Sequence, residues 1–145
     1  MSKYVVGIDL GGTKIYTALA DHRGRVCAET RIPTGAREGP GAVIGRIVES
    51  VRRVMQEAGV GQGEVAALGI GSPGPLDPES GVVYSSPNLQ GWTDVPLRDR
   101  LREGTGIPVW LDNDANLGAL GEYNFGAGRG SKNMLYVTVG TGIGA

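Results

Sequence analysis

Four short segments of the chain combine residues that could bind phosphate or a sugar. The first is Asp9-Leu10-Gly11-Gly12-Thr13-Lys14. Its two glycines would let backbone N–H groups approach a phosphate closely, while Thr13 offers a hydroxyl and Lys14 a positive charge. The Asp9 carboxylate could hold a hydrated Mg²⁺ ion. A plain Gly-Gly hairpin turn explains the same residues as well, so both interpretations stay open.

The second segment, Leu111-Asp112-Asn113-Asp114-Ala115-Asn116, falls where a strand gives way to a helix. The N–H groups and the dipole of that helix would keep Asp114 ionised in the first turn. An ionised carboxylate there suits a base that accepts a proton from a hydroxyl during phosphoryl transfer. Asn113 can donate and accept hydrogen bonds, as sugar hydroxyls require. Capping of the helix by Asp112 or Asn113 is the competing explanation.

The third segment, Gly69-Ile70-Gly71-Ser72-Pro73-Gly74, matches the glycine spacing of a dinucleotide-binding loop. Pro73, together with Pro75 and Pro78, excludes the helix that must receive the pyrophosphate. The loop therefore either lines a cleft or is a rigid turn. Further along, Asn88 and Trp92 could contact a sugar by hydrogen bond and ring contact, although an ordinary turn explains this stretch too.

The fourth segment, Gly140-Thr141-Gly142-Ile143-Gly144, places a hydroxyl between alternating glycines after a predicted strand. It is either a second phosphate loop or a flexible end of the chain.

Hydrophobic patterning predicts the elements that position these segments. Three strands joined by short turns must be antiparallel neighbours, and a strand, long helix, strand unit adds a parallel strand. The predicted strands cover residues 4–10, 14–20, 26–33, 65–70, 82–85, 108–111 and 133–139. A loop over 35–41 precedes a helix over 43–58 that ends at Gly59. A second helix is capped by Asp94 and stopped by Gly104, and a third follows Asp112 or Asn113.

Composition excludes several classes of protein. The 145 residues fit one domain, or one domain and the start of another. A net charge of −1 leaves no basic excess for nucleic acid or for a membrane surface. No apolar run approaches the ~20 residues of a spanning helix, and the N-terminus lacks the apolar core of a signal peptide. Cys27 is the single cysteine, so an intrachain disulfide is excluded and a cytoplasmic protein is expected.

The order of these motifs resembles the ROK family (repressor, open reading frame, kinase) of sugar kinases, and within it the bacterial glucokinases. The resemblance covers essentially the whole chain. It implies an α/β, ribonuclease H-like lobe of the sugar kinase, actin and chaperone ATPase superfamily, with a mixed five-stranded sheet flanked by helices. Residues 1–125 would form this lobe. Residues 126–145 would form the hinge and the first strand and phosphate loop of a second lobe that is otherwise absent.

The resemblance also implies roles for individual residues. Asp114 matches the catalytic base that acts on the sugar 6-hydroxyl, and Asn113 matches a sugar ligand. Gly74 and Asn88 would line the same pocket. Two loops would hold ATP and Mg²⁺, with Asp9 on the metal through water: Asp9, Gly11, Gly12, Thr13 and Lys14 in the first, and Gly140, Thr141 and Gly142 in the second.

Departures from the family pattern limit what this chain should do alone. The sugar-binding Glu and His, the adenine pocket and the zinc-binding cysteines of the family belong to the second lobe, so zinc is expected only there. We therefore expect the chain to be inactive by itself and the full-length protein to phosphorylate a hexose, most simply glucose, as a homo-oligomer. A non-catalytic sugar-binding lobe and a sugar-responsive regulator are the alternatives. The strand at Tyr4 leaves no room for a preceding DNA-binding motif, which disfavours the regulator.

Overall fold

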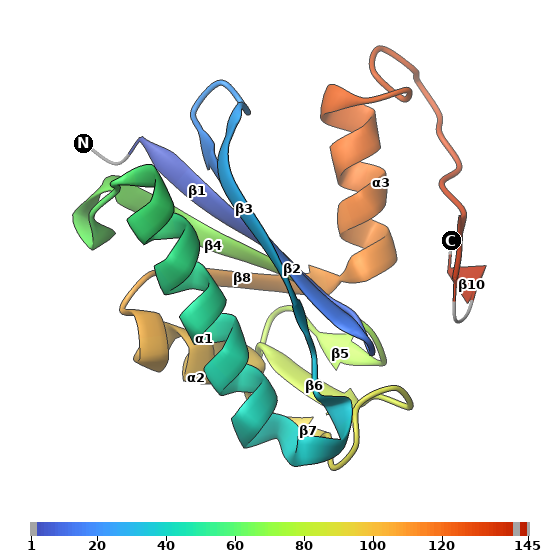
Figure 1. Cartoon of the computed structure of the whole chain (residues 1–145). Helices are drawn as coiled ribbons and strands as arrows, with labels where there is room; N and C mark the ends of the chain where they lie inside the picture. Colours follow the sequence, from blue (N-terminus) through green and yellow to red (C-terminus); the bar gives the residue numbers. More distant parts are fainter. Residues whose placement is uncertain (1–2, 141–142, 145) are drawn as a thin grey trace.

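A mixed five-stranded sheet forms the centre of the molecule (Figure 1). The computed structural model describes residues 3–140 and 143–144. The central strands are β1 (Tyr4–Leu10), β2 (Lys14–Asp21), β3 (Val26–Pro33), β4 (Val65–Ser72) and β8 (Val109–Asn113). Their order is β3-β2-β1-β4-β8; β1, β2 and β3 pair antiparallel, whereas β4 and β8 run parallel to β1. This order confirms the predicted mixed sheet.

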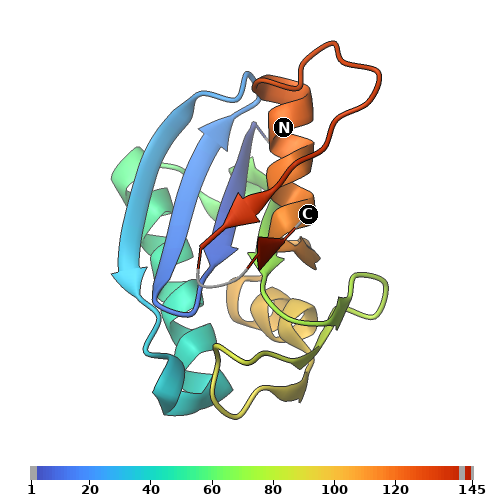
Figure 2. The same cartoon turned by 90° about the vertical axis from the view of Figure 1, so that its right-hand side faces the viewer.

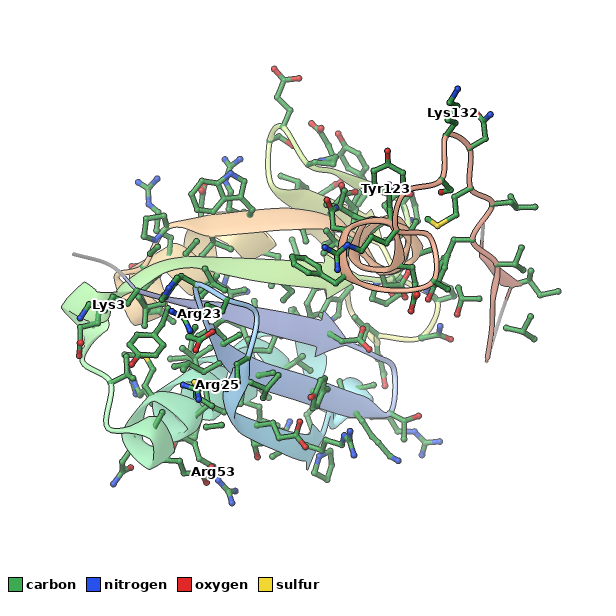
Figure 3. All side chains as sticks on the ribbon, turned by 90° about the horizontal axis from the view of Figure 1, so that it is seen from above. Lys3, Arg23, Arg25, Arg53, Tyr123 and Lys132 are labelled. Carbon is green, nitrogen blue, oxygen red and sulfur yellow. The ribbon has the colours of Figure 1, made fainter. Side chains whose placement is uncertain are left out.

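Helices cover both faces of the sheet (Figures 1 and 2). α1 (Gly39–Ala58) and α2 (Leu97–Thr105) pack on one face, and α3 (Asp114–Phe125) contacts β4 and β8 on the other. Figure 3 shows Arg53 of α1 and Tyr123 of α3 on opposite sides of the sheet. The hydrophobic core lies beneath α1 and α2, because alternate residues of β1 (Val6, Ile8 and Leu10) are buried on that face.

The long helix begins earlier than its apolar spacing predicts. Residues 36–38 form a 3₁₀ helix (Ala36–Glu38), and α1 starts at Gly39 with Pro40 in its first turn. Proline fits there because its missing N–H needs no helical partner. The predicted end is confirmed, since Gly59 adopts φ 66° and donates its N–H to the carbonyl of Gln56.

Both predicted boundaries of α2 are wrong. Pro96, not Asp94, is the N-cap residue, and Asp94 lies in β7 with a φ of 49°. Gly106, not Gly104, ends the helix in the left-handed conformation. Gly104 lies inside the helix, where a Cβ atom would come within 2.8 Å of Val48 on α1. This glycine therefore allows the two helices to approach each other.

A small antiparallel sheet lies between β4 and α2, within the stretch that the sequence predicts to be rich in turns. It consists of β5 (Leu76–Asp77), β6 (Val82–Ser85) and β7 (Thr93–Val95), of which only β6 is predicted. A short 3₁₀ helix (Gln62–Glu64) precedes β4. Leu89 and Trp92 are buried in the loop between β6 and β7, so the loop is anchored in the core. Burial of Trp92 removes its ring from the predicted sugar contact.

After α3 the chain crosses the open side of the sheet (Figure 2). Only the end of the predicted strand over 133–139 is a strand: β9 (Thr138–Val139) pairs with β10 (Ile143–Gly144). Within the described residues, 133–137 have no neighbouring strand to complete their hydrogen bonds, which explains the shorter element. Leu135 and Val139 are 81% and 74% exposed. No helix of the described residues is both long and apolar enough to cross a membrane.

Candidate functional site

The site is built where three parallel strands end together. β1, β4 and β8 share one direction, so Leu10, Ser72 and Asn113 come to the same edge of the sheet. A cleft of about 320 Å³ opens at this edge. The structure brings seven of the predicted site residues to its lining: Gly11, Gly12, Gly74, Asn88, Asn113, Asp114 and Gly140. Thr141 and Gly142 lie outside the described residues.

The β1–β2 hairpin presents unpaired backbone donors on one side of this cleft. Gly11 donates its N–H to the carbonyl of Lys14 at 2.9 Å, which closes the turn. The N–H groups of Gly12 and Thr13 meet no acceptor among residues 3–140 and 143–144. Successive free N–H groups of this kind form a concave site for an anion. The Thr13 and Lys14 side chains are exposed and lie outside the cleft lining.

The start of α3 lies on the opposite side of the cleft. Asn113 is the N-cap residue, because its side-chain oxygen accepts hydrogen bonds from the N–H groups of Ala115 (2.9 Å) and Asn116 (3.4 Å). Asp112 is not the cap; its carboxylate accepts from the Asn116 side chain at 3.0 Å. Capping uses the Asn113 oxygen and leaves its NH₂ group available to a ligand. The capping and ligand-binding interpretations are therefore compatible.

Asp114 lies in the first turn of α3 and is exposed to the cleft. One of its carboxylate oxygens accepts the Ala115 N–H at 2.8 Å. The other is free to accept a proton or a hydrogen bond.

Asp9 lies beside the cleft, in a groove of about 530 Å³ that Asp114 also borders. The groove follows the open side of the sheet beneath α3 and is floored by Gly7, Ala18 and Gly69. The surrounding protein raises the pKa of the Asp9 carboxyl by desolvation, even though solvent reaches the side chain, and the negative charge of Asp114 raises it further. The two carboxylates therefore favour a cation between or beside them.

Backbone packing fixes the loops that carry Gly74 and Asn88. Gly74 has a φ of 91°, and a Cβ atom there would overlap the carbonyl oxygen of Ser85 at 2.0 Å. Asn88 lies against the β1–β2 hairpin, because a Cβ atom on Gly12 would come within 2.8 Å of the Asn88 Cβ. The hairpin and the Asn88 loop are therefore in direct contact.

Thr34 is a residue of the site that sequence reasoning missed. It follows β3 and is fully buried, yet its hydroxyl donates to the carbonyl of Gly11 in the hairpin at 2.7 Å. A single threonine between a strand and a loop carries no recognisable pattern, so only the three-dimensional contact reveals it.

Comparison with known proteins identifies the family. The model of the ROK family matches residues 5–145. The chain belongs to the ROK family. It is 43% identical to a glucokinase of Thermotoga maritima over 140 residues, which are 97% of this chain and 43% of that protein. The chain therefore spans less than half the length of this curated ROK relative.

Solved ROK structures share the fold. A ROK hexokinase from Thermus thermophilus superposes with a TM-score of 0.86 at 45% identity, covering 97% of this chain and 45% of that one. A ROK glucokinase from Streptomyces griseus, in complex with glucose and AMPPNP, superposes with a TM-score of 0.87 at 35% identity. The match covers 97% of this chain and 43% of that one. The fold is the actin-like, ribonuclease H-like ATPase fold of ROK sugar kinases, as predicted.

The family also contains regulators. A putative xylose repressor of Caldicellulosiruptor is 36% identical over 141 residues, which are 97% of this chain and 35% of that protein. Membership of the ROK family therefore includes both kinases and repressors.

Proposed function

We propose that the full-length protein carrying this chain transfers the γ-phosphoryl group of ATP to the 6-hydroxyl of a hexose, with glucose as the first candidate. The observation that carries the proposal is the single cleft shared by Asp114, Asn113, Asn88 and the Gly11–Gly12 turn. It joins a base, sugar-binding amides and an anion-binding turn, which are the groups that phosphoryl transfer needs. Glucose and AMPPNP bound to the Streptomyces griseus relative support the choice of ligands.

Each group has a defined task in this reaction. Asn113 and Asn88 would hold sugar hydroxyls, and the Gly74 backbone would shape the same pocket. Asp114, in the first turn of α3, would accept the hydroxyl proton as the oxygen attacks phosphorus. The free N–H groups of Gly12 and Thr13 would stabilise the phosphate oxygens of the donor, and Lys14 would add its positive charge. Gly140, Thr141 and Gly142 would form the second phosphate loop.

Asp9 is the residue that fits a magnesium ion. Mg²⁺ is commonly held by one or two carboxylates together with water and substrate phosphates. Desolvation, and after it the negative charge of Asp114, raises the pKa of the Asp9 carboxyl, and a cation beside the two carboxylates would offset that negative charge. When bound, Mg²⁺ would offset the charge on the donor phosphates. Among the described residues no three His, Cys, Asp or Glu side chains group together as a fuller metal site.

A second lobe in the rest of the protein would complete the enzyme. This chain spans 43% of the Thermotoga maritima glucokinase, and Leu135, Val137, Val139 and Ile143 leave an exposed apolar row after α3. The second lobe would follow the boundary near residue 125, cover this row and supply the remaining sugar ligands and any zinc site. A cytoplasmic homo-oligomer remains part of the proposal, as does inactivity of the 145 residues alone.

A sugar-responsive regulator is the second candidate, favoured by the match to the xylose repressor. It would use the sugar-binding residues without phosphoryl transfer. The presence of both Asp9 and Asp114 in facing positions favours the kinase, because a sensor needs no base.

The deciding experiment measures ADP release by the full-length protein with ATP, Mg²⁺ and a panel of hexoses. Hexose-dependent release would support the kinase, and the ranking would name the substrate. Sugar binding without ADP release would support the regulator instead. The same assay on purified residues 1–145 tests whether this chain alone is inactive, and we expect no hexose-dependent ADP release from it.

A further inference from the structure

Thr34 binds the phosphate hairpin through two of its own groups. Its backbone N–H donates to the carbonyl of Thr13 at 2.9 Å, and its hydroxyl donates to the carbonyl of Gly11 at 2.7 Å. The Thr34 side chain is 0% exposed, so its hydroxyl donates from within the protein interior. One buried residue thus binds two of the carbonyl groups at the hairpin tip, one through its side chain and one through its backbone.

Because a peptide unit is planar, a hydrogen bond that holds its carbonyl also fixes the direction of its N–H group. The carbonyl of Gly11 and the N–H of Gly12 belong to one peptide plane and point in opposite directions. The same holds for the carbonyl of Thr13 and the N–H of Lys14. By holding both carbonyls, Thr34 directs the two N–H groups away from itself. The Gly12 N–H is one of the two donors, with that of Thr13, that find no acceptor in the part of the chain that the structure describes.

Thr34 is itself held from the side of α1. Arg46 donates from Nη1 to the Thr34 carbonyl at 3.2 Å and pairs through Nη2 with Glu38 at 2.5 Å. Ala36, two residues after Thr34, accepts the N–H of Gln90 with its carbonyl. Gln90 belongs to the loop that carries Asn88. The segment after β3 therefore connects the helix, the phosphate hairpin and the proposed sugar loop.

We propose that Thr34 is a positioning residue that orients the hairpin N–H groups for the phosphates of the nucleotide, with Arg46 holding Thr34 in place. This inference rests on the proposed function. Thr34 touches neither substrate nor cofactor, so it acts only through Gly11 and Thr13. Its loss should weaken nucleotide binding and leave sugar binding unchanged.

The test compares Thr34→Val, Thr34→Ser and Thr17→Val in the full-length protein, with the Kd for AMPPNP with Mg²⁺ and the Kd for glucose measured by calorimetry. Thr17 is an equally buried threonine of the sheet, and its hydroxyl bonds to Ser50 at 2.7 Å, away from the hairpin. We expect Thr34→Val to raise the AMPPNP Kd about tenfold, as the loss of one buried hydrogen bond would. Thr34→Ser keeps the hydroxyl and should restore binding.

Equal AMPPNP affinity in Thr34→Val and wild type, or an equal loss in Thr17→Val, would overturn the positioning role. If Thr34→Val fails to fold, Arg46→Met takes its place. We then expect a two- to threefold rise in the AMPPNP Kd. An unchanged AMPPNP Kd in Arg46→Met would contradict the inference. A wild-type protein that binds no AMPPNP would instead refute the proposed function. The two failures are therefore distinguishable.

Discussion

Asp9 and Asp114 face each other across Gly71. Asp9 on β1 pairs with Gly71 on β4, and Gly71 pairs with Asp112 on β8, two residues before Asp114. The pKa of Asp9 is raised by desolvation and, further, by the charge of Asp114, which approaches it over the position where Gly71 has no side chain. A backbone position without chemistry of its own thus sets the spacing of the two carboxylates.

Replacing Gly71 with alanine should disturb this spacing. A Cβ atom there would lie 3.2 Å from the Asp114 Cα, so α3 would have to shift. We expect Gly71→Ala to lower kcat of the full-length protein at least tenfold while the protein stays folded. Gly69→Ala is the matched control on the same strand, because a Cβ atom there meets nothing within 4 Å. An equal loss in both variants would contradict the explanation.

Asp114→Asn should remove the proposed base. We expect turnover to fall by roughly 10²–10⁴, the range for loss of a general base, with the Kd for glucose nearly unchanged. Asp112→Asn is the control, because an amide oxygen can still accept the bond from Asn116. Steady-state ADP release and sugar calorimetry provide the two readouts. A change in turnover of less than tenfold would remove Asp114 from this role.

Asp9 should make thermal stability depend on pH. Its folded-state pKa lies above the ordinary value of 3.8, so the folded protein binds the proton more tightly than the unfolded chain. Stability should therefore decrease as the pH rises from about 3.8 through the raised pKa. We expect Asp9→Asn to raise Tm at pH 7, and the gain to shrink as the pH approaches 4. A gain that is constant with pH would show that charge is not its cause.

Variants of Asn113 should separate capping from sugar binding. Asn113→Ala removes the cap and should cost about 1 kcal/mol of stability. Asn113→Ser retains an N-cap oxygen but no NH₂ group, so we expect near-normal Tm with a raised KM for the sugar. Denaturant unfolding and a sugar titration measure the two effects. A normal sugar KM in Asn113→Ser would leave only the capping role.

The sequence predicts the sheet well because its strands alternate or run continuously apolar between glycine turns. Boundaries that depend on tertiary contacts are less predictable. Gly104 and Gly106 are equally good helix stops by type, and only the approach of Val48 explains why the first of them lies inside α2. The strand predicted over 133–139 fails for a related reason, since a β pattern needs a neighbouring strand.

Most of the candidate cleft could be predicted because strand ends place motif residues at one edge. Asn88, Gly74 and Asp114 arrive there as expected. Thr34 could not be found, because its role consists of two hydrogen bonds to carbonyls of another loop. For Trp92 the sequence left a sugar contact and an ordinary turn open, because an aromatic residue beside a turn has the same pattern whether it is buried or exposed.

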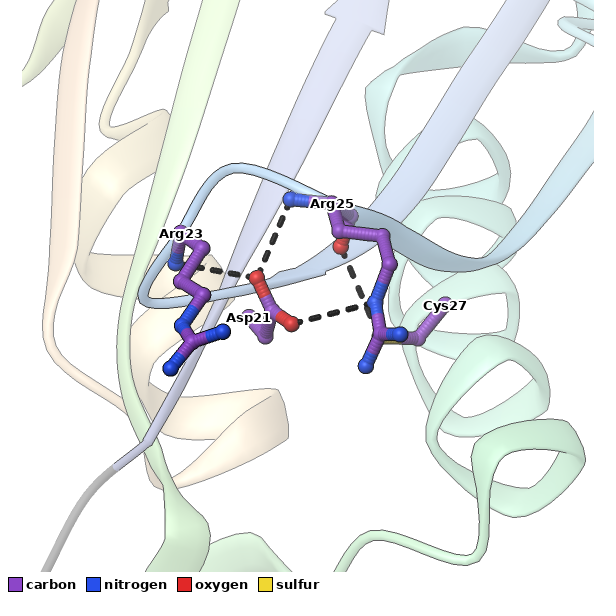
Figure 4. Close-up of polar contacts among 4 residues, drawn as sticks. All are labelled: Asp21, Arg23, Arg25 and Cys27. Carbon is purple, nitrogen blue, oxygen red and sulfur yellow. Dashed lines mark hydrogen bonds and ion pairs between the residues drawn. The ribbon is translucent and has the colours of Figure 1, made fainter.

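The hairpin between β2 and β3 lies at the far end of the sheet from the cleft. Its turn is fixed by Asp21, which accepts the N–H groups of Arg23 and Arg25 and pairs with the Arg25 side chain (Figure 4). Cys27 follows on β3, exposed and the single thiol of these 145 residues. A fluorophore attached to that sulfur would lie on the ordered strand β3, remote from Asp114 and the cleft. This chain therefore already contains a native attachment point for a reporter.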